Sequence, residues 1–174
     1  LAQSVEELPV STRKFPYVNF KADREIGNNV LEVKNISYKD SDGVQLLKDF
    51  SLKVNRTDKI AFVGIEHNSI SALFDIINEE KKPESGEYFW GQTTSHTYLP
   101  RDNSRFFDND YNITEWLKQY SKEQDDAYVR GFLGRMLFSG DESLKKVKVL
   151  SGGEKVRCML SKLMLSGANV LIMD

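Results

Sequence analysis

The chain has 174 residues, of which 40% are apolar and 29% charged, and its formal net charge is −2 at pH 7. These values predict one water-soluble folded domain with or without an arm, and they exclude a global basic field that would attract nucleic acid or an anionic membrane. The single cysteine, Cys158, excludes an internal disulfide, and no apolar run is long enough to span a bilayer. We therefore expect a cytoplasmic protein without direct membrane insertion.

The first half of the chain predicts an arm followed by strands. Residues 1–29 mix Pro, Gly, Asn and charged residues without a sustained period, which is typical of a linker or arm. Apolar alternation around a turn predicts antiparallel strands at residues 30–36, 44–47 and 50–54. A short apolar run, KIAFV at residues 59–63, is typical of a strand buried on both faces, and residues 71–78 have helical spacing.

The second half predicts two short strands, a helical insertion, and a last helix and strand. Strands are expected at residues 87–90 and 97–99, helices at 113–120 and 125–137, and loops at 100–112 and 139–149. A helix at 152–165 and a buried strand at 169–174 follow. Antiparallel strands, then strand, loop and helix, then a helical insertion, then helix and strand indicate an α/β fold with a helical subdomain.

The first motif is a loop between a predicted strand and a predicted helix, as a phosphate-binding P-loop requires. The loop, GIEHNSIS, keeps the first glycine and the last hydroxyl of the pattern G-x-x-x-x-G-K-[ST], at Gly64 and Ser71. Ser69 stands where the second glycine is expected, and Ile70 replaces the lysine whose charge meets the β- and γ-phosphates. Glu66 adds a negative charge where phosphates would lie. For the loop alone, an ordinary turn between strand and helix is the better interpretation.

The second motif, LSGGE at residues 150–154, opens a predicted helix. Ser151 is a natural N-cap residue. Gly152 and Gly153 let a backbone approach a phosphate closely, and the positive end of the helix dipole points in the same direction. Glu154 completes the motif.

The third motif is the apolar strand VLIMD, which ends in Asp174. This pattern places a carboxylate at the carboxyl end of a parallel sheet, where ligands bind. In a P-loop ATPase such a carboxylate helps to hold Mg²⁺. For this motif alone, a strand followed by an Asp turn is the better interpretation.

LSGGE followed by VLIMD resembles the signature and Walker B motifs of the ABC ATPase superfamily. The stretch LEVKNISYKDSDGVQLLKDFSLKVNRTDKIAFVG is similar to the family's first β-subdomain running into its P-loop, and PESGEYFWG is similar to the turn and strand after the P-loop helix. The resemblance implies a P-loop ABC cassette at residues 30–174, with an antiparallel β-subdomain, a RecA-like parallel sheet core and a helical signature subdomain. Since the family's catalytic glutamate and switch histidine would follow Asp174, we interpret the cassette as incomplete at its C-terminus.

The resemblance implies ATP and Mg²⁺ as cofactors. Ser71 and Asp174 would contact the metal, with Asp174 also the catalytic-site carboxylate. The nucleotide would contact two groups of residues and one aromatic ring: Gly64, Ser69 and Ser71 in the P-loop; Ser151, Gly152, Gly153 and Glu154 in the signature; and Tyr38 as the candidate for stacking on adenine.

Residues 11–16, STRKFP, and the aromatic-rich stretch after them resemble the linker before the second cassette of bacterial ABC-F proteins. Those are soluble tandem-cassette ATPases, many of which act on ribosomes. The segment YLPRD at residues 98–102 resembles their Q-loop region, with Arg101 where glutamine is usual. The resemblance therefore implies a second cassette as partner, and the ribosome as a further one.

ABC cassettes act in head-to-tail pairs, so each ATP lies between the P-loop of one cassette and the signature of the other. We therefore expect this chain to donate Ser151 and Gly153 to a partner's ATP, to bind nucleotide poorly at its own P-loop and not to hydrolyse ATP alone. Two alternatives stay open. One is the ATP-binding subunit of a membrane transporter, against which the arm argues. The other is a nucleotide-free regulatory cassette, which Ile70 favours.

Overall fold

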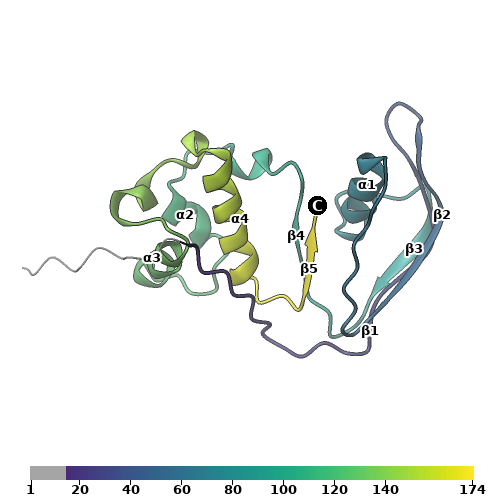
Figure 1. Cartoon of the computed structure of the whole chain (residues 1–174), viewed down its shortest axis with the longest axis horizontal. Helices are drawn as coiled ribbons and strands as arrows, with labels where there is room; N and C mark the ends of the chain where they lie inside the picture. The colour runs from purple at the N-terminus through teal and green to yellow at the C-terminus, as the bar shows by residue number, and fades with distance from the viewer. Residues whose placement is uncertain (1–14) are drawn as a thin grey trace, which may run out of the picture.

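The computed structural model describes residues 15–174, so residues 11–14 of the predicted linker motif lie outside the described part. Figure 1 shows an antiparallel sheet with one helix against it, a pair of parallel strands in the middle, and a group of helices on the far side. The predicted α/β fold with a helical subdomain is confirmed.

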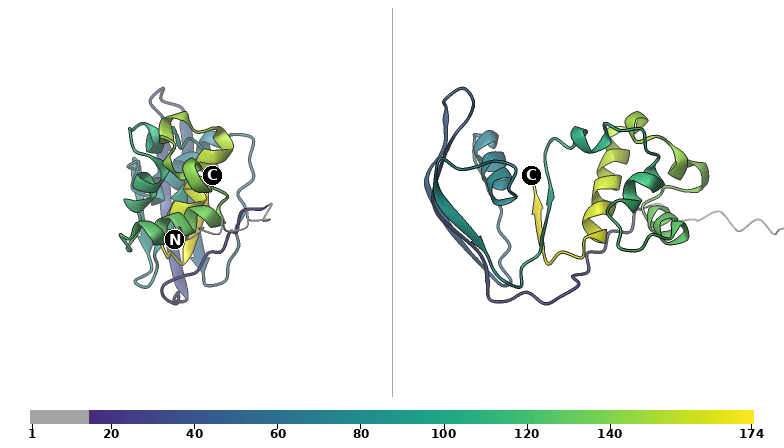
Figure 2. Two further views of the ribbon diagram at one scale, coloured as in Figure 1. Left: turned by 90° about the vertical axis from the view of Figure 1, so that its left-hand side faces the viewer. Right: turned by 180° about the vertical axis from the view of Figure 1, so that it is seen from behind.

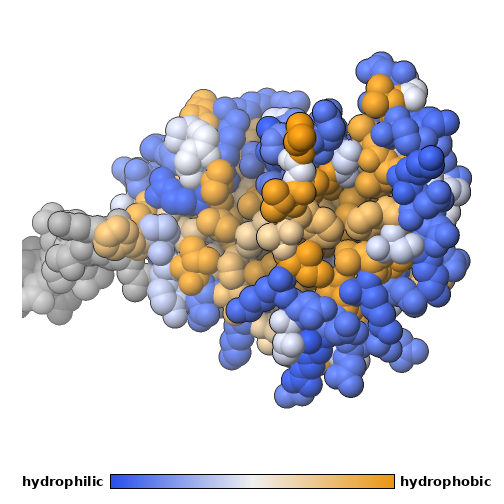
Figure 3. Space-filling model, turned by 45° about the vertical axis from the view of Figure 1, so that its right-hand side comes forward, coloured by the Kyte–Doolittle hydropathy of each residue, from blue (hydrophilic) through white to orange (hydrophobic). Residues whose placement is uncertain are grey.

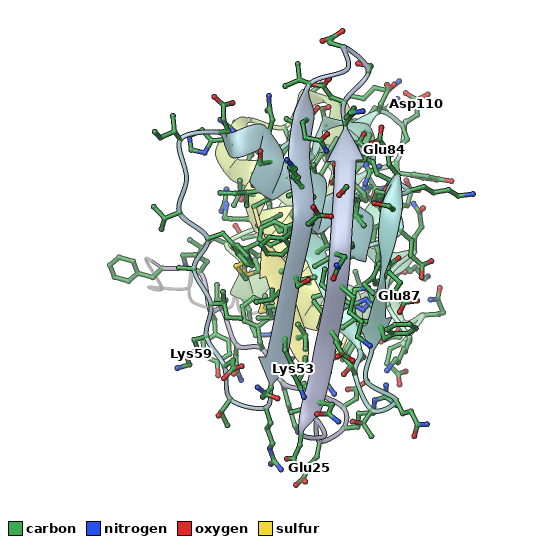
Figure 4. The ribbon with its side chains drawn as sticks, turned by 90° about the vertical axis from the view of Figure 1, so that its right-hand side faces the viewer. Glu25, Lys53, Lys59, Glu84, Glu87 and Asp110 are labelled. Carbon is green, nitrogen blue, oxygen red and sulfur yellow. The ribbon has the colours of Figure 1, made fainter. Side chains whose placement is uncertain are left out.

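The antiparallel sheet contains β1 (Asn29–Lys39), β2 (Gln45–Asn55) and β3 (Ser85–Trp90), in the order β2-β1-β3. The two strands expected at 44–47 and 50–54 form the single strand β2. The inner face buries Val33 and Ile36, whereas the outer face carries charged residues such as Lys53 and Glu87 (Figure 4). This contrast is what alternation along a half-buried strand produces.

Gly86, in PESGEYFWG, is required where β3 crosses an irregularity of β1. Its φ is +88°, in the region that favours glycine. A Cβ at this position would collide with the backbone of Asn35, where the pairing of β1 with β2 also shifts register. A glycine therefore permits the close contact between β1 and β3.

Helix α1 (His67–Ile77) covers the inner face of the sheet and starts four residues before the predicted Ser71. Its buried side chains include Leu73, Ile76 and Ile77, the same residues whose spacing predicted the helix. The second half of the predicted P-loop therefore belongs to the start of this helix.

The predicted buried strand at residues 59–63 is wrong. The segment forms no strand, and Val63 is 94% exposed. Figure 4 shows labelled Lys59 on a segment apart from the edge of the sheet. The lining of an apolar groove of about 290 Å³ includes Ile60 and Phe62 of this segment as well as the last strand of the chain. Because a strand is stabilised by hydrogen bonds to a neighbour, apolar composition alone does not form one.

The parallel core consists of β4 (His96–Leu99) and β5 (Val170–Met173). The prediction that β5 is buried is wrong in part: Ile172 is buried, but Leu171 is 36% exposed and Met173 is 47% exposed. Within the described residues β5 pairs only with β4, so its other edge faces the groove. Figure 3 shows apolar side chains gathered across the middle of one face of the molecule.

The helical subdomain contains α2 (Ile113–Lys118), α3 (Asp126–Arg135) and α4 (Gly152–Leu165), as predicted. The two predicted loops contain short 3₁₀ turns, η1 (Ser104–Phe107), η2 (Gly140–Leu144) and η3 (Val147–Val149). Trp116 is 1% exposed at the centre of the subdomain core, and its indole N–H donates to the carbonyl of Phe106 (2.6 Å). Cys158 is fully buried in the same core.

Residues 15–28 form an arm that runs along one side of the molecule, from the helices to β1 (Figures 1 and 2). The amide of Tyr17 donates to the carbonyl of Arg135 at the end of α3 (2.8 Å). The amide of Asp23 donates to the carbonyl of Gly167, between α4 and β5 (2.9 Å), and the amide of Gly27 donates to the Thr93 hydroxyl (2.8 Å). The arm therefore contacts the helical subdomain and also the connection between β3 and β4.

Candidate functional site

The structure brings together the last residue of the predicted P-loop and the last residue of the Walker B strand. The Ser71 hydroxyl, in the second turn of α1, donates to Oδ2 of Asp174 (2.6 Å). The backbone amide of Asp174 donates to the carbonyl of Leu99 and extends the parallel pairing of β5 with β4 (3.0 Å). Two side chains 103 residues apart in the chain therefore meet at the carboxyl end of the parallel strands.

These two side chains line an open hollow of about 660 Å³. This is within the size range of small-molecule sites. The other lining residues come from α1, the segment after it, β4 and the segment that follows β4: Asp75, Glu80, Lys81, Tyr98, Pro100, Arg101, Asp102 and Arg105. The hollow is therefore rich in charge and opens beside the carboxyl ends of β4 and β5.

Two ion pairs organise one side of the hollow. The guanidinium of Arg105 donates two hydrogen bonds to the Glu80 carboxylate (2.8 and 2.6 Å), and these bonds lower the pKa of Glu80. The Lys81 ammonium lies 3.0 Å from Oδ2 of Asp75, whose Oδ1 accepts a hydrogen bond from the Tyr98 hydroxyl (3.1 Å). Burial, followed by the charge of Asp75, raises the pKa of Tyr98, so its phenol stays protonated and donates.

The arrangement of Ser71 and Asp174 fits a magnesium ion. A hydroxyl and a carboxylate converge within 2.6 Å, and oxygen ligands are those that Mg²⁺ prefers. Among residues 15–174 no group of three or more His, Cys, Asp and Glu side chains could hold a metal by itself. The ion would therefore take its remaining ligands from water and from phosphate, as Mg²⁺ usually does in nucleotide sites.

The other predicted P-loop residues lie outside the lining of the hollow. Gly64 is exposed, and an added Cβ would meet only the end of the Ile70 side chain, at 4.0 Å, so there is open space beside this residue. Ser69 lies in the first turn of α1, with its amide donating to the carbonyl of Glu66 (3.2 Å). Ile70 packs against the apolar cluster under the sheet. No cation stands at the lysine position.

The predicted signature forms the start of α4. Ser151 is the N-cap residue and forms a reciprocal capping box with Glu154. The Ser151 hydroxyl donates to Oε2 of Glu154 (2.7 Å) and the Ser151 amide donates to the same oxygen (2.8 Å). These two bonds, and then Lys145, lower the pKa of Glu154 to about 2. Gly152 and Gly153 are exposed, and a Cβ added to either would meet nothing within 4 Å. The motif does not line the hollow that contains Ser71 and Asp174.

Tyr38, the candidate for stacking on adenine, lies half-buried on β1 and outside the lining of the hollow. The ammonium of Lys81 lies 5.8 Å from the centre of its ring. The ring therefore already has a cation as a neighbour, and its contact with a nucleotide stays a prediction.

Sequence reasoning missed the ion pairs beside the hollow, and it missed Lys162. The ammonium of Lys162, on α4, lies 3.9 Å from the ring centre of Phe106 and 4.7 Å from that of Tyr120. Burial, followed by the charge of Arg105, lowers its pKa to about 8. The pair of Arg105 with Glu80 and both ring contacts of Lys162 join residues far apart in the chain, so no short-range pattern announces them. The pair of Lys81 with Asp75 is closer in the chain, but the sequence gives no sign that its two side chains face a site. Only Arg101 carried a signal, through its place in the segment YLPRD.

Comparison with known proteins gives a consistent result. The sequence profile of the family described as "ABC transporter" matches residues 47–174. "Uncharacterized ABC transporter ATP-binding protein YkpA" from Bacillus subtilis is 53% identical over 98% of this chain and 32% of its own length. "ABC transporter F family member 5" from Arabidopsis thaliana is 30% identical over 93% of this chain and 23% of its own length. "Energy-dependent translational throttle protein EttA" from Haemophilus influenzae is 29% identical over 86% of this chain and 27% of its own length.

The chain therefore spans a third or less of the length of these relatives. Among solved structures, a bacterial Atm1-family ABC exporter with ATP bound superposes with a TM-score of 0.66 at 17% identity, over 90% of this chain and 30% of that one. At this identity the likeness establishes a shared fold.

Proposed function

The chain belongs to the ABC transporter family, and on this premise we propose that it is an F-type ATP-binding cassette that binds and hydrolyses ATP together with a second cassette. The observation that carries the proposal is the position of the signature. Ser151, Gly152 and Gly153 are exposed at the start of a 14-residue helix, yet they lie outside the hollow that contains Ser71 and Asp174. A signature so placed serves a nucleotide held by another cassette.

The half-site on this chain is incomplete. Ser71 and Asp174 would hold Mg²⁺, which when bound would supply positive charge to offset that of the phosphates. The amides at the start of α1, near Gly64 and Ser69, would face the phosphates. Ile70 contributes no charge, and Glu66 at the N-cap opposes an anion, so this half-site binds ATP more weakly than a complete P-loop does.

The half-site offered to the partner is complete. Gly153 has open space where a side chain would stand, so a phosphate group can approach the backbone of the first turn of α4. The Ser151 hydroxyl lies at the N-cap of the same helix, where it donates a hydrogen bond to Glu154. The helix dipole adds its positive end. ATP bridging the two cassettes would hold them closed, and its hydrolysis would release them.

The partner, the compartment and the process are further parts of the proposal. One relative is named as an F family member and another as a translational throttle, and on this support we propose a sister cassette as partner, the ribosome as target and the cytoplasm as location. No helix within residues 15–174 has the length and apolar character needed to cross a bilayer.

One alternative has a specific observation in its favour. Ile70 is partly buried, packs against the apolar cluster under the sheet and offers no charge to a phosphate, and this favours a cassette that keeps the fold and regulates without binding nucleotide itself. That cassette would still present its signature, so the two functions differ only at the chain's own half-site.

The test is ATP hydrolysis by this chain in the presence of its partner cassette, with and without Ser151→Ala. We expect a loss of at least tenfold in kcat, while the chain alone stays inactive. Ser139→Ala is the matched control, because Ser139 is an exposed serine at the start of η2, outside the signature. Equal activity of wild type and Ser151→Ala, at equal folded fraction, contradicts the proposal.

A further inference from the structure

Without the P-loop lysine, the chain lacks the positive charge that this residue directs at the phosphates of a bound nucleotide. In P-loop ATPases a cation besides Mg²⁺ faces the β- and γ-phosphates. Here Ile70 occupies its position and packs into the apolar cluster. If the hollow beside Ser71 and Asp174 accepts a triphosphate, another side chain lining it must supply the charge.

Three cations line the hollow, and two of them are already paired. Lys81 is held by Asp75 at 3.0 Å. Arg105 is held by both oxygens of Glu80, at 2.8 and 2.6 Å. Neither can turn toward a phosphate without leaving a carboxylate unpaired.

Arg101 is the exception. Within the described residues its guanidinium makes no hydrogen bond or ion pair, and the side chain is exposed. It lies two residues after Leu99, whose carbonyl accepts the amide of Asp174 at 3.0 Å, so its backbone is anchored next to the carboxyl end of β5. An unpaired cation therefore stands on the same rim as the Ser71 and Asp174 pair.

We propose that Arg101 supplies the positive charge toward the phosphates of a bound nucleotide that Ile70 cannot supply. This inference rests on the proposed function, and it concerns the chain's own half-site. The ligand class is a nucleoside triphosphate with Mg²⁺, recognised at this point through its terminal phosphates. The altered P-loop is then compensated from the segment after β4.

The chemistry of arginine suits this role. A guanidinium stays charged at all physiological pH values and donates two parallel hydrogen bonds to a phosphate. Four carboxylates line the hollow, from Asp75, Glu80, Asp102 and Asp174. With Lys81 and Arg105 paired, Arg101 and Mg²⁺ are the groups that offset the remaining negative charge before a triphosphate enters.

The experiment measures binding of MgATP, and separately of magnesium tripolyphosphate, to the full chain by titration calorimetry. Tripolyphosphate has no base or ribose, so it reports on phosphate recognition alone. Arg101→Gln should weaken both ligands at least tenfold, because a hydrogen-bonded charge contact is lost. Arg101→Lys should lose less. Ile70→Lys introduced into Arg101→Gln should recover binding of both ligands.

Arg130→Gln is the matched control. Arg130 is an exposed arginine on α3, and its replacement removes the same charge as Arg101→Gln but far from the hollow. It should change either dissociation constant less than twofold. Thermal unfolding of every variant checks the fold, which Arg101→Gln should leave unchanged because the side chain has no partner in the described residues.

Each outcome decides the matter. If wild type and Arg101→Gln bind equally, or if Arg130→Gln weakens binding as much, the role of Arg101 is refuted while the proposed cassette function stands. If wild type binds neither ligand but the double variant of Arg101→Gln with Ile70→Lys does, Arg101 does not compensate, and this inference fails alone. If no variant binds, both the inference and the chain's own half-site fail, and the Ser151→Ala comparison still judges the signature.

Discussion

Replacing Gly153 with alanine should stabilise the isolated chain. Gly153 lies in the first turn of α4 with no neighbour within 4 Å of an added Cβ, and its φ is outside the region that requires glycine. A glycine in a helix costs about 0.5–1 kcal/mol relative to alanine, and a first-turn position should give about half a kilocalorie. For a chain of this size that gain corresponds to a rise of roughly 1–2 °C in melting temperature.

The same substitution should lower the ATPase activity of the paired cassettes. The new methyl group would stand where a phosphate of the partner's ATP must approach the backbone. We expect a loss of at least tenfold in kcat/KM, measured with the partner cassette in excess. Denaturant unfolding of the isolated chain gives the stability in parallel.

Gly131→Ala provides the matched control. Gly131 lies within α3, and a Cβ there also meets nothing within 4 Å. It should gain a similar or larger stability, of about 1 kcal/mol, with unchanged activity. The reasoning is refuted if Gly153→Ala destabilises the chain, or if it leaves hydrolysis as high as Gly131→Ala does.

Three further predictions concern named side chains. The folded-state pKa of Glu154, about 2, lies below its ordinary value of 4.5, so the stability that it contributes is present above that value and is lost as the pH falls from about 5 toward 2. Glu154→Gln should flatten this acid limb of the unfolding free energy. The pKa of Lys162 is lowered to about 8 from 10.5, so folding should become more favourable as the pH rises between these values, and Lys162→Met should abolish that rise in urea titrations. Ser71→Ala should cost less than about 1 kcal/mol of stability, because the lost hydrogen bond is exposed, yet it should reduce the effect of Mg²⁺ on ATP binding, compared by calorimetry with and without the metal.

Elements fixed by local sequence were predicted well. Helix α4 has the predicted bounds, because Ser151 caps its start and Gly167 follows its end. Strand β1 follows from alternation between buried and exposed positions. Both features involve only a few neighbouring residues, so they can be recognised in the sequence without knowledge of the rest of the fold.

Elements that depend on a distant partner were not predicted. The run KIAFV has strand composition but has no neighbour to pair with in the described structure. The contact between Ser71 and Asp174 came only through the family resemblance, since no local pattern joins residues 103 positions apart. The free state of Arg101 could not be inferred at all, because it depends on Glu80 and Asp75 having taken the other two cations.

The contacts of the arm limit how far a linker joined to its upstream end can extend. Only residues that are free to extend contribute to the reach of a linker, at about 3.5 Å each. From Tyr17 to Asn28 the backbone is fastened at several points to α3, the α4–β5 connection and the turn after β2. A segment joined upstream of the arm would therefore depart from the helical subdomain and not from the edge of β1. The residues of the arm, about 40 Å long if fully extended, would therefore add nothing to the length of a flexible linker. The effective concentration of a domain joined through that linker would depend only on the free residues upstream of α3.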